Sequence, residues 1–311
     1  MTGDVKHGGC AVILGPTAAG KTGVSLEMAR DEFEIISADS VQVYKYLDIG
    51  SGKPEPSERE RVCHYLIDRV EPDYPFTAGD FCREANAALQ EIMGRGKLAM
   101  MVGGTGLYID SFFQGLSDIP DVSKDIREIL RDEMRERGPE ALHEELLKVD
   151  PGFGERISSR DTQRIMRGLE VYRGTGRPLS SYFRDRRHNR PGGPLYIGIF
   201  EEREVLRKRI DRRVETMMAR GLVEEVRSLR ERGYGPGLKS MRSIGYAEVN
   251  RLLDGESDMA DTVNKIKTVT KQYAKRQMTW FGKNDRIQWF KNTDMKRIDA
   301  LIRQWLDGRE K

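Results

Sequence analysis

The chain has 311 residues, a mass of 35.5 kDa and a formal net charge of +3, and its 38% of hydrophobic residues exclude a disordered chain. Its longest apolar runs, of about five residues, are far shorter than the roughly twenty that a membrane span needs, and residues 1–9 lack the apolar core of a secretory signal. Three widely spaced cysteines form no CxxC pair, so we expect a reduced, cytoplasmic protein without a zinc module, of about two domains for its length.

The first hundred residues alternate between strand patterns and helix patterns. The predicted elements are a strand at 10–14, a helix at 21–30, a strand at 33–38, a helix at 76–93 capped by Thr77, and a strand at 97–102. The strands are short and apolar throughout, as strands buried on both faces are. Strands that alternate with helices predict a parallel α/β sheet.

The pattern changes after about residue 116. Residues 123–172 contain no convincing strand and read as helices broken at 138–139 and 150–152. An apolar strand returns at 195–200, and helices at 202–219, 221–232, 243–254 and 258–280 precede a last strand at 287–290. The sequence therefore predicts a catalytic core in two parts, 1–116 and 196–311, around an all-helical insert at 117–195.

The near-neutral net charge hides two basic stretches. Residues 151–195 hold ten arginines, no lysine and four acids, and residues 265–283 hold six bases and no acid. Within them, Arg160, Arg164 and Arg167 have helical spacing, as do Lys267, Lys271 and Lys275. These rows predict a cationic surface for a polyanion, with solvated surface charge as the alternative.

Residues 15–22 match the phosphate-binding motif G-x-x-x-x-G-K-[ST] between a predicted strand and a predicted helix. Its members are Gly15, Pro16, Thr17, Ala18, Ala19, Gly20, Lys21 and Thr22. In such loops the backbone N–H groups close around phosphate oxygens at a helix N-terminus. Lys21 would add a positive charge, and Thr22 is the expected Mg²⁺ ligand.

Asp39 directly follows the second predicted strand. The carboxyl ends of strands in a doubly wound sheet surround the ligand, so Asp39 is expected near the phosphate loop. It could serve as a general base, as a residue that holds magnesium indirectly through a water or another ligand, or simply as a turn or helix-cap residue. An ordinary GTPase or ATPase is disfavoured, because no NKxD motif is present and the strand at 97–102 leads into Gly-Gly-Thr-Gly instead of an acidic residue.

The order of several blocks resembles the bacterial tRNA dimethylallyltransferases, also called tRNA isopentenyltransferases. The blocks are GPTAAGKT, ISADSVQVYKYLDIGSGKP, HYLID, VGGTGLYI, RDTQRIMRGLEVYRGTGRPLS, SIGY and YAKRQMTWF, and they span about residues 11–282. The resemblance implies a P-loop kinase-like parallel sheet with a helical insert that clamps the anticodon stem-loop. It also implies transfer of a dimethylallyl group from dimethylallyl diphosphate to the N6 amine of the adenosine 3′ to the anticodon, in tRNAs that read codons beginning with U.

The resemblance also assigns roles to residues. Asp39 matches the general base, Thr17 a hydroxyl that contacts the diphosphate, and Arg209 and Arg213 the arginines that grip the diphosphate; surface arginines are the alternative for that pair. The residues that it places at the tRNA are Asp39, Ser40, Val41, Gln42, Thr105, Arg127, Gln163, Arg164, Ile165, Met166, Arg167, Arg242, Gly245, Tyr246, Lys275, Arg276 and Gln277. Val41 departs from the family, which often has a basic residue there.

Three other functions remain open: a small-molecule P-loop kinase, a transferase that prenylates free adenine nucleotides, and a non-catalytic RNA-binding protein. The first two leave the basic stretches unexplained, and the intact Lys21, Thr22 and Asp39 argue against the third. We expect a tRNA-modifying enzyme that uses Mg²⁺ and acts as a monomer. The motif alone would equally accommodate ATP.

Overall fold

The computed structural model describes residues 9–30, 32–117, 119–183 and 193–308. It divides the chain into two compact units, Met1–Phe113 with Arg190–Lys311, and Gln114–Asn189. The predicted boundaries at 116/117 and 195/196 therefore need correction, since the strand that begins at Leu195 belongs to the sheet of the first unit. Residues 1–8, where no signal was expected, and residues 184–192 of the arginine-rich stretch lie outside the described residues.

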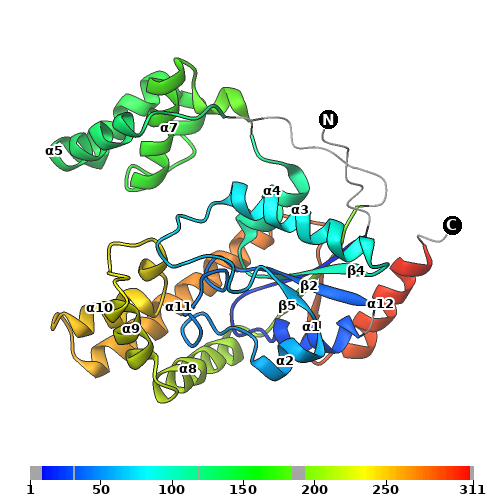
Figure 1. Cartoon of the computed structure of the whole chain (residues 1–311). Helices are drawn as coiled ribbons and strands as arrows, with labels where there is room; N and C mark the ends of the chain where they lie inside the picture. The colour runs from blue at the N-terminus through cyan, green and yellow to red at the C-terminus, as the bar shows by residue number, and fades with distance from the viewer. Residues whose placement is uncertain (1–8, 31, 118, 184–192, 309–311) are drawn as a thin grey trace. The chain divides into compact units, whose positions relative to one another are not determined.

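The first unit is built on a six-stranded sheet in the order β3-β2-β4-β1-β5-β6, parallel at every pairing (Figure 1). The strands are β1 (Cys10–Leu14), β2 (Phe33–Ala38), β3 (His64–Tyr65), β4 (Leu98–Gly103), β5 (Leu195–Phe200) and β6 (Gln288–Lys291). The α/β class and the parallel sheet are confirmed. The two-residue β3 was not predicted, because it is too short to show a pattern.

Alternate residues of the central strands face two different apolar clusters. Val12 and Leu14 pack with α3 (Ala78–Gly94), α4 (Gly106–Gln114), α9 (Leu222–Glu231) and α10 (Tyr246–Leu253). Ala11 and Ile13 pack with α1 (Lys21–Ala29) and α12 (Met295–Asp307). Helices thus cover both faces, which leaves the carboxyl ends of the strands as the place for a ligand.

The other helices of this unit are α2 (Pro56–Arg61), α8 (Arg203–Ala219) and α11 (Met259–Phe281), with a short 3₁₀ turn at Ser240–Arg242. The predicted helix at 243–254 begins only at Tyr246. Thr77 caps α3 as predicted, since its hydroxyl accepts the Asp80 N–H. α2, α4 and α12 were not predicted.

The second unit is helical throughout its described elements. It contains α5 (Lys124–Val149), α6 (Pro151–Gly154), α7 (Thr162–Thr175) and a 3₁₀ turn at Leu179–Tyr182. The break predicted at 138–139 is present as a kink in α5, where Gly138 has φ 78° ahead of Pro139. Its core consists of Leu130, Leu142, Leu146, Ile165 and Leu169. No helix in the described parts of the chain is both long and apolar enough to cross a membrane.

Candidate active site

The phosphate loop joins β1 to α1 and lies against the neighbouring strand β5. Gly15 has φ +144°, and a Cβ built on it would lie 2.2 Å from the Ile199 carbonyl oxygen. Gly20 has φ +97°, and its Cβ would meet the Asn292 side chain at 2.7 Å. A glycine is therefore required at both ends of the loop, by its conformation and by the close approach of β5 at Gly15 and of the Asn292 side chain at Gly20.

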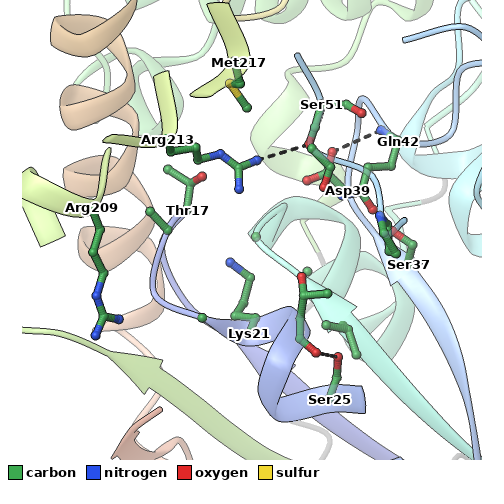
Figure 2. A pocket seen from close by; sticks show the side chains of 18 of the residues that line it. Thr17, Lys21, Ser25, Ser37, Asp39, Gln42, Ser51, Arg209, Arg213 and Met217 are labelled. Atoms are coloured by element: carbon green, nitrogen blue, oxygen red, sulfur yellow. Dashed lines mark hydrogen bonds between the residues drawn. The ribbon is translucent and has the colours of Figure 1, made fainter. Parts of the chain in front are cut away.

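Lys21 begins α1, and its side chain points into the open space in front of the loop (Figure 2). Its Nζ donates to the Pro16 carbonyl oxygen at 2.9 Å. Burial lowers the pKa of Lys21 from 10.5 to about 8, the nearby Asp39 carboxylate opposes this shift, and the Arg213 guanidinium adds to it. The half-buried ammonium group thus lies among other charges at the first cavity, where an anion would stabilise it.

Asp39 follows β2 and faces the same space. Its Oδ1 accepts the N–H groups of Val41 at 2.8 Å and Gln42 at 3.3 Å, and no described residue hydrogen-bonds to Oδ2. The next peptide is also fixed, because the Ser40 N–H donates to the Thr105 hydroxyl at 3.1 Å. The turn role considered for Asp39 is therefore real, yet it uses only one carboxylate oxygen and leaves the other for chemistry.

Two adjoining cavities lie at this edge of the sheet. The first, of about 550 Å³, is lined by Thr17, Lys21, Thr22, Asp39, Arg209 and Arg213 among others. The second, of about 330 Å³, shares Thr17, Asp39 and Arg213 with the first. The predicted phosphate-binding and catalytic side chains are thus brought together, and Asp39 stands where the two cavities meet.

The two arginines of α8 differ in their surroundings. Arg209 pairs with Glu201 at 2.7 Å and approaches Asn292 at 3.5 Å. Arg213 has no carboxylate partner within salt-bridge distance among the described residues and donates to the Ser51 carbonyl oxygen at 3.5 Å. Burial lowers the pKa of Arg213, and the Asp39 carboxylate opposes this. Of the two, Arg213 has the charge that a bound anion would satisfy.

Gln277 was predicted to contact tRNA, and the structure gives it a different role. It is 5% exposed, its Oε1 accepts the Thr17 N–H at 2.9 Å, and its Nε2 donates to the Gly104 carbonyl oxygen at 2.9 Å. Both ends of the amide are thus used to join the phosphate loop to the end of β4. Gln277 also lines the first cavity, so the contact with tRNA that the resemblance implies stays a prediction beside this supporting role.

We expect Gln277→Leu to weaken diphosphate binding about ten-fold, because it leaves the Thr17 N–H and the Gly104 carbonyl unpaired and frees the loop to move. The measurement is the Kd for inorganic diphosphate, with Gln272→Leu, an exposed position on the same helix, as control. Equal Kd values for the two variants would contradict this role.

Other predicted tRNA residues of the first unit lie around the second cavity. Its lining includes Ser40, Val41, Arg242, Gly245 and Arg276, while Gln42 lines the first cavity. Thr105 adjoins them through its bond to Ser40. Tyr246 is an exception, because its side chain is fully buried and its hydroxyl donates to Glu225 at 2.7 Å. It therefore supports the site without lining either cavity.

In the helical unit, several predicted tRNA residues already have partners. Arg127 and Arg167 both pair with the buried Glu170, at 2.5 and 3.3 Å, and Arg164 pairs with Asp161 at 3.0 Å. Ile165 is fully buried in the core, which excludes the predicted tRNA contact by its side chain. The remaining members of the set are Gln163, which is exposed, and Met166, which is half-buried.

The two predicted basic rows also need correction. Arg160 precedes Asp161, the N-cap of α7, so it does not share a helix face with Arg164 and Arg167. On α11, Lys267 pairs with Glu215 and Lys271 with Asp211, each at 2.6 Å. Lys275 is exposed and has no ion-pair partner among the described residues. Two of the three lysines of the α11 row are therefore neutralised by acids of α8 that sequence spacing did not reveal.

Sequence reasoning missed several residues of the cavities. Tyr273 and Met217 line both cavities, and Ser37 and His64 line the first. Burial and the Asp39 carboxylate raise the pKa of Tyr273 to about 12, so its hydroxyl stays protonated. A signal was available for Tyr273, which lies one helical turn before Gln277. None was available for Met217, whose place depends on how α8 packs.

The comparisons with known proteins all point to the same protein family. The family profile described as IPP transferase matches residues 42–285. The chain is 48% identical to tRNA dimethylallyltransferase 2 of Geotalea uraniireducens, over 89% of this chain and 90% of the relative. It is 47% identical to the tRNA dimethylallyltransferase of Geobacter metallireducens, over 89% and 91%.

Two solved structures are also similar. The full-length tRNA isopentenylpyrophosphate transferase of Bacillus halodurans has a TM-score of 0.71 at 34% identity and covers 97% of each chain. A eukaryotic dimethylallyltransferase acting on tRNA has a TM-score of 0.78 at 28% identity, over 93% of this chain and 75% of that one.

Proposed function

Since the chain belongs to the IPP transferase family of enzymes that prenylate tRNA, we propose that it transfers a dimethylallyl group from dimethylallyl diphosphate to tRNA. The acceptor is the N6 amine of the adenosine 3′ to the anticodon, in tRNAs that read codons beginning with U. The observation that carries the proposal is the pair of cavities that share Asp39, one lined by the phosphate loop and one by predicted tRNA residues. The enzyme acts in the cytoplasm as a monomer.

The first cavity suits the diphosphate of the donor. It offers the phosphate loop at the N-terminus of α1, the Lys21 ammonium and the Arg213 guanidinium. As the carbon–oxygen bond of the donor breaks, negative charge builds up on the leaving diphosphate. Positive groups already fixed around that charge lower the barrier, because they need no rearrangement in the transition state.

The second cavity suits the acceptor adenine. An N6 amine is hard to reach inside a stacked loop, so the base must leave the stack to react. Its nitrogen forms a bond to the allylic carbon as diphosphate departs, and the amine then carries one proton too many. Asp39, at the junction of the two cavities, takes that proton on Oδ2, while Oδ1 stays bonded to the turn. Atoms and charge balance with prenylated adenosine, diphosphate and a proton on Asp39.

Mg²⁺ is the proposed cofactor, and the cavity fits it. No group of three or more His, Cys, Asp or Glu in the described ranges could hold a metal alone. Mg²⁺ is commonly held by one or two protein oxygens together with phosphate oxygens, and Thr22 supplies a hydroxyl at the first cavity. When bound there, the ion would neutralise charge on the diphosphate.

The test of the proposal is a product analysis. Unmodified bulk tRNA is incubated with the protein, Mg²⁺ and either dimethylallyl diphosphate or ATP. The tRNA is then digested to nucleosides, whose masses are determined by mass spectrometry. We expect adenosine heavier by one dimethylallyl group with the first donor and no change with ATP. Phosphate transfer from ATP would favour the kinase alternative, and prenylation of free adenosine monophosphate in place of tRNA would favour the nucleotide prenyltransferase.

The ion pairs of α11 lead to a prediction about tRNA binding. Lys275→Ala should weaken tRNA binding and reduce the slope of log Kd against log salt by about 1, the effect of losing one phosphate contact. Lys267→Ala, the matched control, should leave the slope unchanged, because its charge is already neutralised by Glu215. Cognate and non-cognate tRNAs should respond alike, since phosphate contacts do not read sequence. Identical slopes for wild type and Lys275→Ala would place the tRNA elsewhere.

A further inference from the structure

Glu225, on α9, accepts hydrogen bonds from the backbone of segment 48–51. The Glu225 side chain itself lines neither cavity. Its Oε2 accepts the N–H groups of Asp48 at 3.2 Å and Ile49 at 2.7 Å, and its Oε1 accepts that of Gly50 at 3.3 Å. Three successive N–H groups thus converge on one half-buried carboxylate, an arrangement that fixes the path of the chain.

Tyr246 completes this arrangement from α10. Its hydroxyl donates to Glu225 Oε1 at 2.7 Å. Its ring lies against Gly50, where an added Cβ would be 2.5 Å from Cε2. The segment is therefore held both by hydrogen bonds and by a ring that only glycine can approach so closely.

The same segment also contacts Arg213, whose guanidinium points toward Ser51 (Figure 2). The Ser51 carbonyl accepts from Arg213 Nη2, and a Cβ on Gly52 would lie only 2.0 Å from that nitrogen. The Gly52 carbonyl in turn accepts Gln42 Nε2 at 3.1 Å. The guanidinium rests directly on a backbone whose position Glu225 determines.

We propose that Glu225 is a positioning residue for the diphosphate: by fixing segment 48–52 it holds the Arg213 guanidinium at the cavity. Glu225 does not touch the substrate and acts through Arg213. The inference rests on the proposed function in one respect, namely that the first cavity binds the donor diphosphate. It goes further in predicting that a residue of α9 controls the affinity of that cavity.

The experiment compares four variants by the Kd for inorganic diphosphate in Mg²⁺ buffer. In Glu225→Gln an amide NH₂ replaces one of two acceptor oxygens and faces an N–H group. Glu224→Gln is the matched control, because it makes the same change one residue earlier at an exposed position that contacts Arg227. Arg213→Ala and the double variant Glu225→Gln/Arg213→Ala test whether the effect passes through the arginine.

We expect Glu225→Gln to raise the Kd about ten-fold, Glu224→Gln to leave it unchanged, and the double variant to match Arg213→Ala within about two-fold, since residues that act as a unit are not additive. A purely structural role would lower the melting temperature without this non-additivity. Tyr246→Phe, which keeps the ring and removes one bond to Glu225, gives a smaller rise and replaces Glu225→Gln if that variant does not fold.

Three results would overturn the inference. If Arg213→Ala weakens diphosphate binding but Glu225→Gln and Tyr246→Phe do not, or if the effects of Glu225 and Arg213 add, the segment does not position the arginine while the proposed function stands. If wild type itself binds no diphosphate, the assignment of the first cavity fails and this inference fails with it.

Discussion

Asp39→Asn is expected to lower the single-turnover rate of prenyl transfer by about 10²–10⁴-fold, the usual effect of losing a general base. The variant isolates that role well. An asparagine Oδ1 can still accept the N–H groups of Val41 and Gln42, so the turn after β2 is kept while the proton acceptor is lost. The measurement uses saturating tRNA and donor, so that only the chemical step is followed.

Diphosphate binding provides the internal control for this variant. The Asp39 carboxylate lines the first cavity together with Lys21 and Arg213, and its negative charge opposes the lowering of their pKa values by burial. Its removal should leave the Kd for diphosphate equal or lower, because one repulsion is gone. A turnover within about three-fold of wild type would remove Asp39 from the role of base, and a large rise in Kd would show that the turn had been damaged instead.

The parts of the site that could be predicted from the sequence are those made by local chain order. The phosphate loop lies between β1 and α1, and Asp39 follows β2, because the ends of parallel strands meet at one edge of the sheet. Motif residues such as Gly15 and Lys21 were found for the same reason, since their function depends on neighbours within a few positions.

The parts that could not be predicted depend on contacts between distant segments. Glu225 is 175 positions from Gly50, and Gln277 is 260 from Thr17. Which lysines of α11 are neutralised depends on how α8 packs against it, and a period of 3.6 residues does not reveal the partner helix. Family resemblance placed Gln277 and Tyr246 at the tRNA, and their burial, which depends on packing between distant segments, gives both side chains supporting roles.

The secondary structure also contains elements that local sequence predicts and elements that depend on contacts between distant segments. α3 was predicted almost to its ends, because Thr77 caps it and apolar residues recur at helical spacing. α4 was missed, because it begins directly at Gly106, in a glycine-rich run that reads as a loop. Its N-terminus is fixed by tertiary contact: a Cβ on Gly106 would lie 2.4 Å from the Trp280 ring.

Lys21→Met is expected to reduce kcat/KM for the donor by about 10²–10³-fold, the loss typical of removing one group that stabilises developing negative charge. Methionine keeps the unbranched shape of the side chain and removes only the ammonium. Lys208→Met is the control, since it makes the same change at an exposed position of α8. That variant should behave as wild type.

The stability of Lys21→Met distinguishes a loss of activity through the missing charge from a loss through unfolding. The pKa of Lys21 is lowered to about 8 in the folded protein, so between pH 8 and 10.5 the unfolded chain binds more protons and stability rises with pH. Below pH 8 Lys21 is charged in both the folded and the unfolded state, so the free-energy cost of burying that charge is at its largest and no longer changes with pH. Lys21→Met should therefore have an equal or higher melting temperature at pH 7, and an inactive variant of this kind cannot be explained by loss of fold.

The pH dependence of the wild type follows from the same pKa. kcat/KM reports the free enzyme, in which Lys21 loses its proton near pH 8. kcat/KM for the donor should thus fall as pH rises through 8, because a neutral amine no longer attracts diphosphate, while kcat should hold to higher pH, since bound diphosphate favours the ammonium. In Lys21→Met the alkaline fall should be absent. A variant that keeps that fall would assign it to another group and leave Lys21 without a role in donor capture.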